Sequence, residues 1–185
     1  MSGGDGSGKS LMSPALRIME VPVETRGSLG PILDQSFTGL YRWHAHRTLR
    51  SVTWVRKAAR GDTHVGLSMS TMLGGSSGYI YYIAVIPSLR AKGVGALLLD
   101  DALRFLRAAG ALQVFACVRA GNIPSIRLLK SRDFMRTGFR KTVHLRGFAN
   151  AVELWLRMVV APGERVFTKS YPRRGDKISV SPAPT

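Results

Sequence analysis

The stretch IAVIPSLRAKGVGALLL, residues 83–99, decides the fold prediction. It begins as a β-prone segment, continues as a loop that carries Arg90 and Lys92, and ends as an apolar run that Gly93 and Gly95 open. A glycine loop that leads into a helix is typical of a phosphate site, because glycines let backbone N–H groups approach an anion and the helix dipole favours negative charge. The alternative is a tight strand-to-helix connection that happens to be basic.

The motifs around this loop point to a family. R-A-K-G-V-G at 90–95 fits the pattern (Gln or Arg)-x-x-Gly-x-(Gly or Ala), and a V-x-P segment precedes it at 85–87. After the helix, a strand ends in VRAGN, an N-x-x-S begins the next helix at Asn122, and Phe134 falls where that helix closes. Together these motifs resemble the GNAT superfamily of acetyl-CoA-dependent N-acetyltransferases.

The order of predicted elements agrees with this resemblance, which is specific over 78–134 and extends in element order over 16–160. It implies an α/β (α+β) domain with a central mixed, mostly antiparallel sheet, split in a V and flanked by helices. We expect strands at 16–24, 51–59, 63–73, 79–87, 111–120, 134–146 and 151–160. We expect helices at 28–40, closed by Gly39, at 95–110 and at 122–133, and a short helix or structured loop at 41–50.

The resemblance implies acetyl-CoA as the cofactor, admitted where the strands over 79–87 and 112–118 separate. Backbone groups of the first strand would bond the pantetheine arm like an added strand, and the glycine loop would cradle the pyrophosphate. The polar residues of N-x-x-S would face the pantetheine and the thioester. The implied cofactor-binding residues are Ile83, Ala84, Val85, Arg90, Ala91, Lys92, Gly93, Val94, Gly95, Ala96, Asn122 and Ser125.

Positions that often hold the acid and the base in this family hold other residues here. Leu129 replaces a tyrosine seven residues after the asparagine, and Cys117 replaces a glutamate before the VR pair. Acetyl transfer needs a proton acceptor for the amine and benefits from a donor for the thiolate. The catalytic candidates are Tyr81, acting through a water, and Cys117, with core packing as the alternative for both. Glu153 is a further candidate.

The acceptor pocket of this family usually lies between the first two helices, where this chain has Tyr41, Trp43, His44 and His46. We expect Tyr41 and Trp43 to contact the acceptor, with aromatic packing under a loop as the alternative. We expect no metal site, because the histidines lack a convincing ligand spacing and Cys117 is the single cysteine.

The formal charge of +16 comes from 27 basic residues, most of them arginine, against 11 acidic ones. Such a field favours anionic partners, including nucleic acid, but an arginine-rich surface without a partner explains it more simply. Contact with nucleic acid is an alternative that we do not favour. No run of 18 apolar residues and no hydrophobic signal region occur, so we expect a cytoplasmic protein without a membrane segment.

The two ends of the chain are expected to be tails. GGDGSGKS at 3–10 fits the phosphate loop of nucleotide hydrolases, but no strand precedes it and Pro14 interrupts the helix it needs. We therefore expect a flexible tail over 1–14, a single acetyltransferase domain over 15–161, and a loosely held basic tail over 162–185.

The sequence thus predicts an N-acetyltransferase that moves an acetyl group from acetyl-CoA to an amine of a small molecule, a peptide or a protein, as a monomer or a homodimer. The excess of basic over acidic residues disfavours a polycationic acceptor. The alternatives are a non-catalytic acyl-CoA-binding protein and a nucleic-acid-associated protein of the same fold, because the usual catalytic tyrosine and glutamate are absent.

Overall fold

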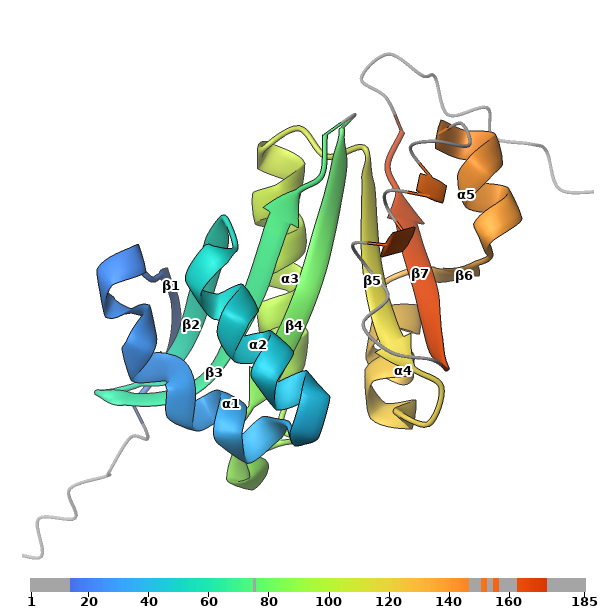
Figure 1. Cartoon of the computed structure of the whole chain (residues 1–185). Helices are drawn as coiled ribbons and strands as arrows, with labels where there is room; N and C mark the ends of the chain where they lie inside the picture. Colours follow the sequence, from blue (N-terminus) through green and yellow to red (C-terminus); the bar gives the residue numbers. More distant parts are fainter. Residues whose placement is uncertain (1–13, 75, 147–150, 153–154, 157–162, 173–185) are drawn as a thin grey trace, which may run out of the picture.

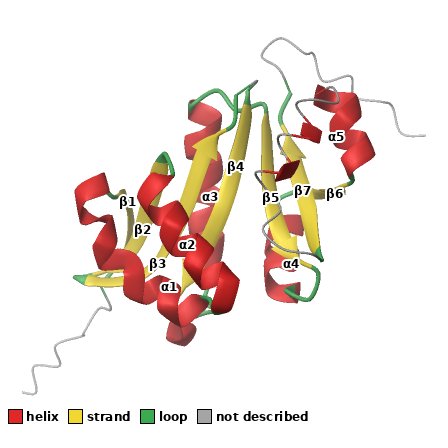
Figure 2. Ribbon diagram, viewed as in Figure 1, coloured by secondary structure: helices red, strands yellow, loops and turns green. Residues whose placement is uncertain are grey.

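The computed structural model describes residues 14–172 apart from 75, 147–150, 153–154 and 157–162. Within these residues, seven strands form one sheet in the order β1-β2-β3-β4-β5-β7-β6, with helices on both faces (Figures 1 and 2). The strands are β1 (Leu16–Glu20), β2 (Trp54–Arg60), β3 (Thr63–Met72), β4 (Ser77–Val85), β5 (Gln113–Arg119), β6 (Met135–Thr137) and β7 (Glu164–Ser170). The helices are η1 (Val23–Leu29), α1 (Gly30–Ser36), α2 (Gly39–Ser51), η2 (Pro87–Leu89), α3 (Val94–Ala108), α4 (Ile123–Lys130) and α5 (Phe139–Arg146).

The sheet is split in a V between β4 and β5. These two strands are parallel, whereas all other neighbouring strands are antiparallel. Their paired register runs from Ser77–Gln113 to Ile80–Ala116 and stops there, although both strands continue. Figure 1 shows the two ribbons diverging beyond this point. The predicted fold class, a mixed and mostly antiparallel sheet that is split and flanked by helices, is confirmed.

Two apolar cores lie on opposite faces of the sheet. On one face, α1 and α2 bury Leu33 and Leu49 against β2 and β3. On the other face, α3 and α4 bury Leu99, Leu106 and Ile126 against β4 and β5. In Figure 2, α1 and α2 lie in front of the sheet and α3 lies behind it. The split therefore lies between two helical layers, each of which can supply side chains to it.

A β-bulge in β4 sets the direction of two tyrosine side chains. The register with β3 passes from Ser70–Ile80 to Met69–Tyr82, so Tyr81 is the extra residue of the bulge. One extra residue reverses the alternation of side chains beyond it. Tyr81 and Tyr82 consequently both pack against the core under α1 and α2.

The predicted strand over 134–146 is wrong for most of its length. Only Met135–Thr137 form a strand, β6, and the chain then enters α5. Both the backbone N–H and the hydroxyl of Thr142 donate to the carbonyl of Gly138, which are helical contacts. A short stretch with few apolar residues fits both the alternation of a strand and the spacing of a helix, and this one is helical. Of the predicted strand over 151–160, the described residues 151–152 and 155–156 are helical.

The predicted tail over 162–185 is wrong for Glu164–Ser170, which form β7. This strand pairs along the whole of β5, from Ser170–Gln113 to Glu164–Arg119, and it separates β5 from β6. The tail was predicted from the Pro, Gly and Arg content of the whole segment. The pairing of β7 with β5 outweighs this composition, because the backbone groups of β5 need hydrogen-bond partners on the side away from β4. The folded domain thus continues past 161.

A local prediction about the first helix also changes. Gly39, expected to close the first helix, begins α2, because Phe37 and Thr38 are extended and separate the two helices.

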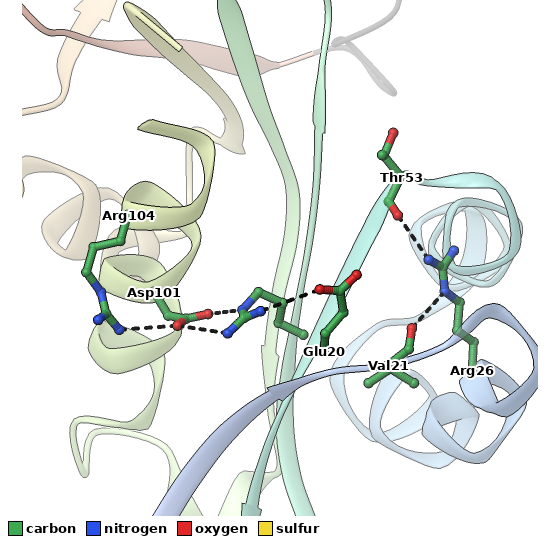
Figure 3. A network of polar contacts seen from close by, with 7 residues as sticks. Glu20, Val21, Arg26, Thr53, Asp101 and Arg104 are labelled. Atoms are coloured by element: carbon green, nitrogen blue, oxygen red, sulfur yellow. Dashed lines mark hydrogen bonds and ion pairs between the residues drawn. The ribbon is translucent and has the colours of Figure 1, made fainter. Parts of the chain in front are cut away.

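Asp100 and Arg104, four positions apart on α3, do not pair with each other. Asp100 accepts two bonds of 2.7 and 2.8 Å from Arg132 after α4, and Arg104 pairs with Asp101 (Figure 3). A bidentate partner holds a carboxylate better than an i,i+4 partner on a helix surface.

A buried arginine fixes α2 over the sheet. Arg26 is 5% exposed and donates to the carbonyl oxygens of Val21, Leu49, Val52 and Thr53 at 3.5, 3.4, 2.7 and 3.1 Å. Figure 3 shows its side chain between Val21 and Thr53. Because two of these carbonyls belong to the end of α2, this cation also complements the helix dipole.

Replacing Arg26 by alanine is expected to lower the free energy of unfolding by about 3 kcal/mol, because several buried carbonyl groups lose their donor. Urea unfolding followed by circular dichroism measures this loss. The matched control is Arg42→Ala, an exposed arginine of α2, for which we expect a change within about 0.5 kcal/mol. A loss below about 1 kcal/mol for Arg26→Ala would contradict the structural role.

Candidate active site

The glycine loop has the geometry of an anion site. Gly93 is the N-cap of α3 and has φ +83°, a left-handed conformation that favours glycine. A Cβ atom built at Gly93 would meet no atom within 4 Å, so the space beside the loop is open. The first N–H groups of α3, from Val94 to Ala96, have no partner within the helix. They provide donors for an anion at the positive end of the helix dipole.

The two cations of this loop differ in what they contact. The guanidinium of Arg90 donates to the carbonyl oxygens of Val85 at 3.0 Å and Gln35 at 3.1 Å. Arg90 thereby ties the loop to the end of β4 and to α1. Lys92 is exposed beside the loop. The structure therefore separates a cation that shapes the loop from one that is accessible to a ligand.

A cleft of about 540 Å³ opens where β4 and β5 separate. Its walls come from both helical layers: the α1–α2 connection and α2 contribute on one side, and α4 contributes on the other. Several residues predicted for different roles meet in this cleft, namely Tyr41, Tyr81, Ile83, Cys117, Asn122 and Ser125. Trp43 does not line it; this side chain is 57% exposed, and the guanidinium of Arg47 lies over its ring.

The N-x-x-S motif forms the cap of α4. The Asn122 side-chain oxygen accepts a hydrogen bond of 3.2 Å from the backbone N–H of Ser125, and Pro124 lies in the first turn, where a proline is well tolerated. This cap fixes the end of the helix at the cleft. Both polar residues line the cleft, so the motif has a structural role as well as a position suited to ligand contact.

A carboxylate that the sequence analysis missed, Glu164, lines the cleft. Glu164 is the first residue of β7, and its Oε1 accepts a hydrogen bond of 2.8 Å from the Tyr41 hydroxyl. Burial and this contact raise the pKa of Tyr41 to about 12. The guanidinium of Arg119 lies 5.5 Å from the centre of the Tyr41 ring. Glu164 was missed because its segment was predicted to be a tail, although ERVFTKS contains an apolar core typical of a strand.

A histidine lies at the edge of this cluster. Nδ1 of His44 is 2.8 Å from the Tyr82 hydroxyl and 3.3 Å from the Thr48 hydroxyl. Burial lowers the pKa of His44, Arg47 lowers it further, and Glu164 opposes the change. The imidazole is therefore neutral at physiological pH and can share a proton with a phenol. His46, by contrast, pairs with Asp34 at 2.9 Å.

Cys117 lies against the buried Tyr79, whose hydroxyl donates to the sulfur. Burial, with the nearby charge of Glu164, raises the pKa of the Cys117 thiol to about 12. Burial likewise raises the pKa of Tyr79. Both groups are protonated at physiological pH. Glu153, the remaining catalytic candidate from the sequence, lies outside the described residues, as does the GGDGSGKS motif.

Cys117 is accordingly expected to react slowly with iodoacetamide. At pH 8 a thiol with a pKa of about 12 is almost entirely protonated, so alkylation of the native protein should be about a thousandfold slower than that of free cysteine. Intact-mass spectrometry over time measures the rate. The same protein unfolded in urea is the control and should react at the rate of free cysteine. Fast alkylation of the native protein would contradict the assigned environment.

The chain belongs to the acetyltransferase (GNAT) family. A model of this family matches residues 15–134, which is more than half of the chain. The resemblance inferred from the glycine loop and the N-x-x-S motif is thereby confirmed. A search of curated proteins finds none that matches the sequence.

Solved structures of acetyltransferases share this fold. The ribosomal-protein-S18-alanine N-acetyltransferase from Escherichia coli superposes with a TM-score of 0.64 at 14% identity, over 89% of this chain and 99% of that one. An acetyltransferase from Bacillus subtilis in complex with CoA superposes with a TM-score of 0.63 at 19% identity, over 85% of this chain and 100% of that one. The PaiA N-acetyltransferase from Thermoplasma acidophilum, in complex with coenzyme A, superposes with a TM-score of 0.63 at 13% identity, over 85% of this chain and 99% of that one. At such identities the similarity establishes the fold.

No helix among the described residues is long and apolar enough to cross a lipid bilayer. No three His, Cys, Asp or Glu side chains of this part of the chain lie together as metal ligands.

Proposed function

We propose that this protein transfers an acetyl group from acetyl-CoA to an amine, with the reacting atoms in the cleft between β4 and β5. The observation that carries the proposal is the cleft itself. It opens at the split of the sheet, and Glu164 lies on one wall and the capped end of α4 on another. A cavity of about 540 Å³ has the size of an ordinary small-molecule site.

The residues of the chain suit coenzyme A, which supplies the acetyl group as a thioester. The first N–H groups of α3 and the open space at Gly93 would take the pyrophosphate, and the exposed Lys92 would add charge. The edge of β4 that β5 leaves uncovered, including Ile83, would bond the pantetheine arm, as β-augmentation does in other complexes. Asn122 and Ser125 would flank its thioester end.

Glu164 is the residue that we propose as the proton acceptor. The attacking amine must be uncharged, so the ammonium first gives a proton to Glu164, directly or through a water. The amine nitrogen then bonds to the carbonyl carbon and loses its second proton to water, and the carbon–sulfur bond breaks with its electron pair on sulfur. The hydrogen bond from Tyr41 would hold the Glu164 carboxylate in place. This assignment supplies a carboxylate that neither Leu129 nor Cys117 can provide.

Cys117, one of the catalytic candidates from the sequence, is a poor proton donor in this arrangement. Cys117, with a pKa of about 12, holds its proton more tightly than a free thiol, whose pKa is about 8.5. It would not readily protonate a departing thiolate. We propose that Cys117 and Tyr81 instead form the walls beside the thioester, and that the thiolate takes its proton from water.

The experiment that tests this function is acetyl-CoA-dependent release of thiol with a panel of amines, amino acids and short peptides. Mass spectrometry of the acceptor should show one added acetyl group for each thiol released. Acetyl-CoA binding without transfer to any amine would favour the alternative of a non-catalytic acyl-CoA-binding protein. Salt-sensitive retention on nucleic acid without acetyl-CoA binding would favour the third alternative.

A further inference from the structure

A second, smaller cavity lies beside the first. It has a volume of about 210 Å³ and lies between the second half of α2 and the sheet. Its lining includes Arg47, Thr48, Ser51, Thr71 and Tyr81. Tyr81 lines the 540 Å³ cleft as well. The two cavities therefore share the side chain that the bulge of β4 directs toward α2.

The chemistry of the second cavity suits an anion. Its lining contains one arginine, Arg47, the imidazole of His44 and four hydroxyl side chains, and no carboxylate is among the described residues that line it. Thr48 is 6% exposed, so this hydroxyl is a fixed, buried group. Arg47 lies over the Trp43 ring, 5.7 Å from its centre, which limits the freedom of the guanidinium. A guanidinium matches the oxygen atoms of a carboxylate or a phosphate. The hydroxyl groups of Ser51, Thr48 and Thr71, which contact the Arg47 carbonyl, His44 and Thr53, make the wall beside it polar.

The two cavities differ in their charged side chains. The larger one is lined by a carboxylate, Glu164, together with Arg119, whereas the charged side chain of the smaller one is Arg47. His44 lines the smaller cavity, and its pKa is raised by Glu164 and lowered by Arg47. A ligand that extends past Tyr81 would thus meet a carboxylate at one end and a guanidinium at the other.

We infer that the acceptor is an amine that also carries an oxyanion several bonds away, with its amine at Glu164 and its anion at Arg47. The inference rests on the proposed function. Since the side chain of Tyr81 stands between the cavities, the two charges must be farther apart than in an α-amino acid. An ω-amino acid or a short acidic peptide meets this requirement, and the +16 charge of the chain also attracts the acidic peptide, whose net charge is negative.

Matched amines test the inference. For ε-aminocaproate, kcat/KM of acetyl transfer is expected to be about tenfold or more above that for n-hexylamine, which lacks the anion. Aminohexyl phosphate distinguishes a carboxylate site from a phosphate site, because the better of the two acids identifies the anion. A preference for n-hexylamine over both acids would overturn the inference.

Variants of Arg47 locate the effect. Arg47→Met is expected to reduce the ratio of kcat/KM for ε-aminocaproate to that for n-hexylamine to about one, through a higher KM for the acid. Arg47→Lys should restore part of the preference, and the control Arg42→Met, at an exposed position of the same helix that lines neither cavity, should retain all of it. An unchanged ratio in Arg47→Met would overturn the inference.

A binding measurement separates this inference from the proposed function. Thermal unfolding with ε-aminocaproate alone should show stabilisation that Arg47→Met loses and Arg42→Met keeps. If acetyl transfer fails for every amine but this stabilisation is present, the proposed reaction is wrong and the anion site stands. If transfer occurs and neither acid is preferred or stabilising, the reaction stands and the anion site is wrong.

Discussion

Replacing Glu164 by glutamine is expected to lower kcat for acetyl transfer about 100-fold or more, because the amide keeps the shape of the side chain and cannot accept the proton of the ammonium. The hydrogen bond from Tyr41 can still form to the amide oxygen, so the local structure should persist. Steady-state thiol release with the best acceptor of the panel measures the change. The loss should shrink as the pH rises, since more of the amine is then uncharged before it binds.

Two comparisons make this result specific. The dissociation constant for acetyl-CoA should remain within about threefold in Glu164→Gln, because the carboxylate lies away from the phosphate loop. The control Glu24→Gln changes an exposed glutamate of η1 and should leave kcat unchanged. A wild-type kcat in Glu164→Gln would show that Glu164 is not the proton acceptor, and Tyr81 would then be the next candidate.

Gly93→Glu is the second substitution with a large expected effect. It places a negative charge at the N-terminus of α3, where the proposed pyrophosphate would lie, and it forces a residue other than glycine to adopt φ +83°. We expect the dissociation constant for coenzyme A to rise about 100-fold, since repulsion and lost helix-terminus contacts both weaken binding. Isothermal titration calorimetry measures the change.

The variant Gly93→Asn separates the effect of the negative charge from the effect of the backbone conformation. Asparagine tolerates the left-handed conformation better than most residues and is uncharged, and the space beside Gly93 is open. We therefore expect its dissociation constant to rise less than about tenfold. Equal affinities of wild type and Gly93→Glu would show that the anion binds elsewhere.

The fold could be predicted from the sequence where local patterns and tertiary structure agree. The glycine loop before α3, the capped start of α4 and the strongly β-prone segment of β4 are each specified by their own local residues. The part after Phe134 could not be predicted in this way. There, α5 occupies a segment with no decisive period, and β7 lies in a segment whose composition is typical of a tail. Long-range pairing with β5 overrides that composition.

The candidate site could likewise be predicted only in part. The walls contributed by Tyr41, Tyr81, Cys117 and Asn122 were predicted from their places relative to the motifs, and the structure brings them into one cleft. Glu164 reaches that cleft only through the pairing of β7 with β5, which joins residues more than 40 positions apart. The bulge that directs Tyr81 toward α2 likewise depends on the register with β3.

Titration of the intact protein with acetyl-CoA, followed by thermal unfolding, tests the central claim most directly. Ligand that binds the folded state stabilises it in proportion to the logarithm of its concentration. We predict a saturable interaction that raises the unfolding midpoint by at least about 3 °C at millimolar acetyl-CoA, an increase that Gly93→Glu largely loses. An unchanged midpoint at millimolar ligand would contradict the assignment of the cleft and the glycine loop to acetyl-CoA.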